Sequence, residues 1–348
     1  MSDFPALHSP GSSRSGPLRA AFGRLQRAFA AARALWVSDA ARAWRAQPGA
    51  RLLARTAQAG LLLALLGYLV WRLTHIGWSE LLASLPGNPW FYVLFALGYL
   101  LLPASELWIY GRHWGRPLWR QAWAFLVKRA YNFGVFDMSG EAYFGVWASR
   151  RLGLSAGKVL ATLKDVNLLS AAASNLATPV FLAALFLFAH DGVEALRLPA
   201  GVVFWGFASI AALAAATLLA GLFQRHILSV DRAQARATFW AHLARFVLGS
   251  LLQALQWAVV FPEAPFTIWL WFLALQLAVS RIPVLPNRDL VFVGLSLSLA
   301  HAVNAPEAAV AAMFVMSAAL MQVANMAVIG VEAGAGAVRA RAPRGTVA

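Results

Sequence analysis

The chain has 348 residues, of which 60% are hydrophobic and only 12% are charged. This balance excludes an ordinary soluble globular domain and is typical of an integral membrane protein. Cysteine is absent, which excludes disulfides and thiolate metal sites. The formal net charge of +15 would suit nucleic acid, but the basic residues cluster beside apolar segments. We therefore expect membrane lipids with anionic or phosphate-bearing headgroups as partners, and no nucleic acid.

Residues 1–55 form an Arg- and Ala-rich arm that lacks the apolar core and cleavage site of a signal peptide. Within this arm, residues 18–36 repeat apolar side chains every three or four positions, which predicts an amphipathic helix on the membrane surface. Its apolar face would comprise Leu18, Phe22, Leu25, Phe29, Ala32 and Trp36. The alternative is a loosely ordered basic tail that only fixes the orientation of the chain.

A helix that crosses ~30 Å of hydrocarbon needs about 20 apolar residues. Stretches of this kind occupy 56–72, 89–110, 167–189, 199–223, 238–260, 265–284 and 308–331, with a shorter one at 290–303. The expected fold is an all-α polytopic membrane protein with about seven or eight transmembrane helices. We expect one or two re-entrant segments and two repeated halves within a membrane domain at 56–331. A short basic tail at 332–348 follows.

Arginine in the loops sets the expected orientation, because cytoplasmic loops carry the excess of Arg and Lys. The arm and the tail are both basic, so both termini should be cytoplasmic, in a bacterial inner membrane. Arg120 precedes residues 121–152, and Arg150 and Arg151 close that segment. All three belong on the cytoplasmic side, so the segment should enter and leave the membrane from that side.

The stretch "YNFGVFDMSGE" explains how the chain could turn back inside the membrane. Gly134 and Gly140 weaken a helix, and Asp137 and Ser139 are residue types that begin one. Glu141 would then stand at the positive end of a short helix, where a carboxylate is favoured. Irregular backbone at membrane depth is tolerated only where protein or a water-filled cavity covers it, which predicts a cavity here.

A second broken segment, "RIPVLPNRDLVFVGLSLSLAHAVN", covers residues 281–304. Pro283 and Pro286 interrupt it, and Asn287, Arg288 and Asp289 are polar. With a single-residue gap, "VFDMSGEAYFG…GLSAGKVLA" aligns with "VLPNRDLVFVG…VNAPEAAVA". Broken segments at matching positions in two halves are typical of a repeat-built transporter whose site lies at the repeat interface.

The order of these segments, with Asn132 followed by Gly140 and Glu141, resembles the membrane region of lysylphosphatidylglycerol synthases, which also occurs as stand-alone flippase-like proteins. That pattern contains Asn, Pro, Gly-Glu and Arg in this order, then a long helix with an E-R pair, then a Pro/Gly-rich loop ending in R-E. The resemblance covers about 56–331 and implies lipid handling within the membrane, including transfer of headgroups between leaflets.

The chain departs from the pattern of that family at several positions. Phe136 and Phe144 replace its Pro and its Arg, and in "TLKDV" Asp165 survives but Val166 replaces the following Arg. The late loop reads Pro286-Asn287-Arg288-Asp289. The chain therefore resembles a divergent member whose substrate identity should not be inherited.

These arguments predict a substrate-binding set made of polar residues in or beside the broken segments. The set is Asn132, Asp137, Gly140, Glu141, Arg150, Arg151, Asp165, Asn287, Arg288 and Asp289.

Simpler structural roles are open for several charged residues. Lys164 and Asp165 would neutralise each other, and Arg150 and Arg151 would anchor a helix end or hold a lipid phosphate bidentately. Glu106, in "LLPASELWIY", would form an ion pair with Arg112 nearby or act as a functional carboxylate. Arg245, near the start of a span, would extend to the interface, and the scattered histidines are interpreted as structural.

Enzyme motifs are missing, so we expect no catalytic residues, no cofactor and no metal. "GLSAGKV" at 153–159 lacks the spacing and the Ser or Thr of a phosphate-binding loop. The short tail leaves no room for the soluble aminoacyl-transfer domain of the synthases. The leading prediction is a flippase-like lipid transporter that binds phosphate-bearing headgroups in an intramembrane cavity. The alternative is a non-transporting scaffold that presents lipid or isoprenoid precursor to a separate enzyme.

Overall fold

The computed structural model describes residues 67, 71, 74, 75, 77–134, 138–188, 200–222, 227–280 and 288–341. All of these belong to one structural unit, Leu65–Ala348. The predicted arm, its surface helix and most of the span at 56–72 lie outside this part of the chain, as do Asp137 and Asn287.

The described residues are helical and contain no strand, which confirms the all-α prediction. The first half contains α4 (Trp78–Ala83), α5 (Pro89–Trp114), η1 (Trp119–Gln121), α6 (Ala122–Gly134), α7 (Ser139–Leu152) and α8 (Ala156–Phe188). The second contains α10 (Ala200–Leu222), α12 (Arg232–Ala258), α13 (Phe266–Ser280), α14 (Arg288–Ser298), η2 (Ala300–Val303) and α15 (Glu307–Arg341).

Local sequence signals account for several helix boundaries. The Asn88 side chain accepts a hydrogen bond from the backbone N–H of Trp90 at 3.0 Å, with Pro89 as the first helical residue of α5. Asp231 caps α12 in the same way. α5 and α7 are each followed by a glycine in the left-handed conformation, Gly115 at φ 65° and Gly153 at φ 64°.

Three helices in the described part are long and apolar enough to cross a membrane: Pro89–Trp114, Ala156–Phe188 and Glu307–Ala335. They coincide with the predicted spans at 89–110, 167–189 and 308–331. α8 begins eleven residues before the predicted span because Val159, Thr162 and Leu163 are buried on one face of its first turns. α15 extends ten residues past position 331, so the first part of the predicted tail is helical.

The predicted break separates two short helices, α6 and α7, which form a helical hairpin. α6 has 13 residues and α7 has 14, which is about 20 Å each, and the two helices pack against each other. The N-cap position of α7 differs from the prediction, because it is Met138, in the left-handed conformation at φ 69°. The Ser139 hydroxyl instead donates to the backbone oxygen of Tyr131 at 2.7 Å.

The predicted span at 265–284 is shorter in the structure. α13 has 15 residues, about 22 Å, and α14 has 11, and they contact each other on either side of the second broken segment. Pro283 and Pro286 cannot donate the backbone hydrogen bonds that would continue α13. The second half therefore also contains a pair of short helices.

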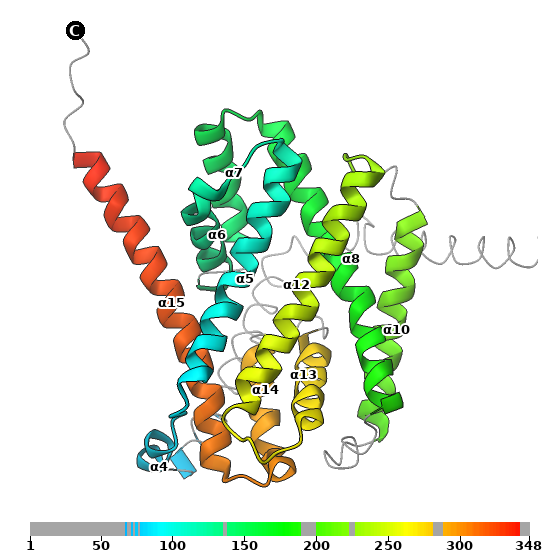
Figure 1. The fold of residues 1–348 in the computed structure, drawn as a ribbon, viewed down its shortest axis with the longest axis vertical. Coiled ribbons are helices and arrows are strands. Elements are labelled where there is room, and N and C mark those ends of the chain that lie inside the picture. Colours follow the sequence, from blue (N-terminus) through cyan, green and yellow to red (C-terminus); the bar gives the residue numbers. More distant parts are fainter. Residues whose placement is uncertain are drawn as a thin grey trace, which may run out of the picture. The chain divides into compact units, whose positions relative to one another are not determined.

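The long helices α5 and α12 pack side by side and run in opposite directions (Figure 1). α6 and α7 lie beside the C-terminal end of α5, and α13 and α14 lie beside the C-terminal end of α12 (Figure 1). Each pair has its own aromatic core. Around α6 and α7 it includes Tyr110, Phe125 and Phe144. Around α13 and α14 it includes Trp257, Phe272, Phe292 and Phe314.

Candidate functional site

A buried lysine joins the hairpin to the long helix α5. Lys128, in the middle of α6, lies 2.7 Å from Glu106 of α5 and 3.6 Å from Glu141 of α7, measured from its Nζ to a carboxylate oxygen. The lysine side chain is 1% exposed, and the two carboxylates are 9% and 12% exposed. We call Glu106, Lys128 and Glu141 the ion triad; it carries one more negative than positive charge.

Aromatic rings complete the surroundings of the ammonium group. Lys128 Nζ lies 5.0 Å from the ring centre of Tyr110 and 5.4 Å from that of Phe144, and 3.5 Å from the Tyr110 hydroxyl. Ring faces attract cations, so these contacts replace part of the lost hydration. Glu141 Oε2 is buried and has no hydrogen-bond partner in the described chain. A buried acceptor of this kind is costly unless something binds to it.

The Asn-Gly-Glu spacing has a geometric explanation. Asn132 Oδ1 accepts a hydrogen bond from the backbone N–H of Gly140 at 2.7 Å, which ties the end of α6 to the start of α7. A Cβ atom at position 140 would overlap the backbone oxygen of Lys128, so only glycine permits this approach. Glu141 follows immediately and meets Lys128. Asn132 and Gly140 thus set the geometry of the triad.

Glu106 has a different partner from the one the sequence suggested. The predicted ion pair with Arg112 is wrong, because Glu106 pairs with Lys128 and the Arg112 guanidinium lies 5.8 Å from the ring centre of Trp108. Arg112 lies six residues after Glu106 on the same helix, whereas Lys128 belongs to a neighbouring helix. The sequence offered one signal of this, since adjacent Lys128 and Arg129 interrupt an apolar run.

Lys164 and Asp165 form the predicted ion pair, with 3.3 Å between Lys164 Nζ and Asp165 Oδ1. The fully buried Asp165 also accepts from the backbone N–H of Ser229 at 2.8 Å, and Lys164 donates to the backbone oxygen of Ile227 at 2.6 Å. Together the two side chains fasten α8 to the chain just before α12. The predicted role of Asp165 in substrate binding stays a prediction.

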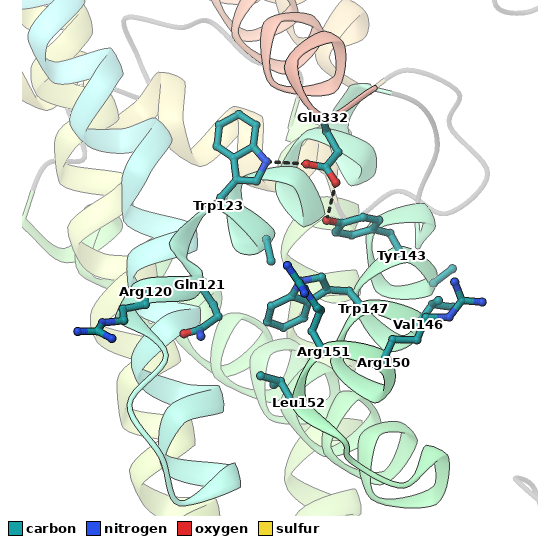
Figure 2. Close-up of a pocket in the computed structure, with 12 residues that line it drawn as sticks. Arg120, Gln121, Trp123, Tyr143, Val146, Trp147, Arg150, Arg151, Leu152 and Glu332 are labelled. Carbon is teal, nitrogen blue, oxygen red and sulfur yellow. Dashed lines mark hydrogen bonds between the residues drawn. The ribbon is translucent and has the colours of Figure 1, made fainter. Parts of the chain in front are cut away.

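Arg150 and Arg151 close α7 and line a cavity of about 960 Å³ between α6, α7 and α15. Figure 2 shows Arg151 beside Trp147, whereas Arg120 and Arg150 extend toward opposite sides. Glu332 of α15 accepts hydrogen bonds from the Trp123 indole at 2.7 Å and from the Tyr143 hydroxyl at 3.5 Å (Figure 2). These two bonds join α15 to both helices of the hairpin. Asn132, Gly140 and Glu141 do not line this cavity.

The candidates of the second half belong to the other helix pair. Arg288 and Asp289 are the first two residues of α14, and this helix lies beside the C-terminal end of α12 (Figure 1). The ion triad comes from α5, α6 and α7 of the first half, so the predicted role of Arg288 and Asp289 in substrate binding stays a prediction. No group of three or more metal-ligating side chains occurs in the part of the chain that the structure describes.

Arg245 does not extend toward a helix end, contrary to the prediction. α12 begins at Arg232, which places Arg245 about 20 Å along the helix axis. Its guanidinium donates to the Ser170 hydroxyl of α8 at 2.9 Å. The predicted span begins at residue 238 because residues 232–237 include polar side chains, whereas the helix begins at Arg232.

Comparison with known protein families, curated proteins and solved structures finds no match to this chain. The structure by itself defines an all-helical protein in which three helices are long and apolar enough for a membrane. Its helical hairpin carries a buried ion triad.

Proposed function

We propose that the chain is an integral membrane transporter of the flippase type, which moves phosphate-bearing lipid headgroups past the hairpin of α6 and α7. The ion triad carries this proposal. Three largely buried ionisable groups in a helical bundle are costly in hydrocarbon, and within membrane proteins such groups mark substrate or ion pathways. The resemblance to the membrane region of lysylphosphatidylglycerol synthases agrees with it.

Exposed tryptophans support placement in a membrane. Trp90, near the beginning of α5, is 62% exposed, and Trp119, just beyond its end, is 66% exposed. Trp240, in the first turns of α12, is 62% exposed. Tryptophan prefers the two membrane–water interfaces, where its ring is apolar and its N–H is wet.

The lengths and order of the helices support two inverted repeats. In the first half, α5, α6, α7 and α8 have 26, 13, 14 and 33 residues. In the second half, α12, α13, α14 and α15 have 27, 15, 11 and 35 residues. α5 and α12 run in opposite directions, which supports a relation between the two sets as inverted repeats, an architecture of many secondary transporters (Figure 1).

The hairpin is the cytoplasmic re-entrant segment of this scheme. Helices of about 20 Å do not cross ~30 Å of hydrocarbon. Arg120 before the hairpin and Arg150 and Arg151 at its end are all exposed, as cytoplasmic loop residues should be. Both termini are then cytoplasmic, in a bacterial inner membrane.

In the proposed mechanism, the basic cavity binds a phosphate-bearing headgroup first. The ion triad then offers charged partners to the headgroup as it moves past the hairpin. Arg151 lines this cavity together with the aromatic side chains of Trp147 and Tyr143. Such a lining suits a lipid, which is charged at its headgroup and apolar beyond it. Glu141 Oε2 is buried outside this cavity and has no hydrogen-bond partner, so it would accept a hydrogen bond from an amine or hydroxyl of a headgroup that moves past the hairpin. Because Lys128 is held by Glu106 at the shorter distance, Glu141 can exchange partners while one ion pair stays intact.

Glu141→Gln in reconstituted liposomes tests this function. The change preserves shape but removes the charge, so transfer of fluorescent phospholipids between leaflets should fall to the rate of protein-free liposomes. Glu263→Gln, at an exposed carboxylate between α12 and α13, is the matched control and should transfer lipid at the wild-type rate. Wild-type rates in Glu141→Gln would refute the role of the triad. Lipid binding by the wild-type protein without any transfer would favour the scaffold instead.

A further inference from the structure

A second buried cation lies on the neighbouring face of α6, where α5 and α15 approach it. Arg129 is 7% exposed, and its guanidinium lies 4.4 Å from the ring centre of Tyr99 and 4.9 Å from that of Phe133. Its Nη2 donates to the Met321 sulfur at 3.3 Å, its guanidinium also interacts with the Tyr99 hydroxyl, and its buried Nε has no hydrogen-bond partner. None of the ion pairs in the described part of the chain includes Arg129.

An asparagine beside it also has an unused donor. Asn325 of α15 is fully buried, and its Oδ1 accepts from the Tyr99 hydroxyl at 3.0 Å, whereas its Nδ2 has no partner. Met321 and Asn325 are one helical turn apart, so both face the Arg129–Tyr99 pair. Thioether sulfur is a weak acceptor. The junction of α5, α6 and α15 thus presents two buried hydrogen-bond donors without an acceptor, Arg129 Nε and Asn325 Nδ2.

The surrounding charges have the same imbalance. Arg245 donates to a neutral hydroxyl, and it lies near enough to Arg129 for the two guanidinium groups to repel each other. Glu106 attracts both guanidinium groups, but it already forms an ion pair with Lys128 at 2.7 Å. With Glu141, this set of buried and half-buried groups comprises three cations and two carboxylates. One monovalent anion would neutralise the set.

We infer that Arg129 and Asn325 form an oxyanion site for a phosphate group that carries one negative charge, such as a phosphodiester. The planar guanidinium offers Nε and Nη donors to two phosphate oxygens, and Asn325 Nδ2 offers a third. The inference rests on the proposed function insofar as it takes the phosphate to be that of a lipid headgroup; inorganic phosphate has the same chemistry.

The site and the basic cavity lie along the same pair of packed helices, α6 and α15. Trp123 and Glu332 bond to each other where these two helices line the cavity. Arg129 lies six residues further along α6 and Asn325 seven residues back along α15, each about 10 Å away along its helix. A small outward movement of α15 would open a path from the cavity to the site.

Thermal unfolding of the purified full-length protein tests the site. Mixed micelles would contain either an anionic phosphoglycerolipid or diacylglycerol with the same acyl chains, and a third arm would replace chloride with inorganic phosphate at equal ionic strength. The wild-type protein should be stabilised by the phospholipid relative to diacylglycerol. Stabilisation by inorganic phosphate as well would identify a free anion as a ligand of the same site.

Two variants separate the site from the fold. Arg129→Gln removes the principal donor. Asn325→Asp places a carboxylate beside Arg129, where it would form an ion pair with the guanidinium and compete with the phosphate. In both, the apparent affinity for the phosphate-bearing ligand should be about 10- to 100-fold weaker, the usual effect of losing a hydrogen bond to a charged group. Asn325→Asp should be at least as stable as the wild type without ligand. Arg112→Gln, at an exposed arginine of α5, should respond as the wild type does.

The site would be overturned by variants that respond to phosphate as the wild type does, or by a wild-type protein indifferent to both phosphate sources. Failure of the proposed function gives a different result. If the wild type transfers no lipid while its phosphate-dependent stabilisation is lost in both variants, the site stands and the transport function is wrong. If transfer occurs and the variants keep the stabilisation, the function stands and the site is wrong.

Discussion

Replacing Lys128 by methionine should destabilise the protein more than replacing either of its carboxylate partners. Met fills a similar volume but carries no charge, so Lys128→Met leaves Glu106 and Glu141 facing each other without a cation. Lys128 is 1% exposed, so solvent cannot take its place. Breaking a buried ion pair by removing one partner costs about 3–5 kcal/mol.

The distances predict the order of the single variants. At an effective dielectric constant of about 20, the Coulomb attraction is about 6 kcal/mol for Lys128–Glu106 and about 5 kcal/mol for Lys128–Glu141, before desolvation. Glu106→Gln removes the stronger attraction. Glu141→Gln removes the weaker one and leaves a neutral Glu106–Lys128 pair in place of a triad with excess negative charge. Glu141→Gln should therefore be the most stable of the three variants, close to the wild type. Glu106→Gln should be less stable, and Lys128→Met the least stable.

Thermal unfolding in detergent, followed by tryptophan fluorescence, measures this order. The triple variant Glu106→Gln/Lys128→Met/Glu141→Gln should recover most of the stability lost in Lys128→Met, because no unpaired charge remains buried. A Lys128→Met protein as stable as the wild type would refute the reasoning. So would a triple variant less stable than Lys128→Met.

Two further predictions concern the hairpin and its orientation. Gly140→Ala should cost about 1–3 kcal/mol or more of unfolding free energy, because the added Cβ overlaps the backbone of α6, whereas Gly157→Ala, with no atom within 4 Å of the new Cβ, should be neutral or slightly stabilising. Equal stability of the two alanine variants, in the same unfolding assay, would contradict the close packing of the hairpin. Cysteines placed singly at Arg120 and Ser155 should both react with an impermeant thiol reagent from the cytoplasmic side, and one at Glu263 from the other side, since the native chain has no cysteine. Labelling of Arg120 and Ser155 from opposite sides would show that the hairpin crosses the membrane.

Local chemistry made the helices and the first break predictable. The spans at 89–110 and 308–331 follow from continuous apolar stretches, and α6 ends at Gly134, where the sequence weakens. These features depend on neighbouring residues along the chain, which a sequence displays directly. The boundaries that the sequence misjudged, such as the beginning of α12, lie where a helix continues into polar residues because other helices pack against it.

The candidate site was predictable only in part. Asn132, Gly140 and Glu141 stand out in the sequence, and the structure shows what their spacing does. Lys128 was missed because its meaning depends on partners 22 residues before it and on the far side of the hairpin break. A charged residue within an apolar stretch indicates that a buried group needs a counter-ion. The identity of that counter-ion depends on which helices become neighbours.

The sequence by itself thus determined that the chain is helical, apolar enough for a membrane, and broken at residues 134–139. Only the tertiary structure decided that Glu106 belongs to Lys128 and not to Arg112, and that Arg129 is left with aromatic rings and a sulfur. The physical reason is the range of the interactions. Helix propensity and hydropathy act over a few neighbouring residues, whereas an ion pair requires two atoms within a few ångströms, and packing alone sets that distance.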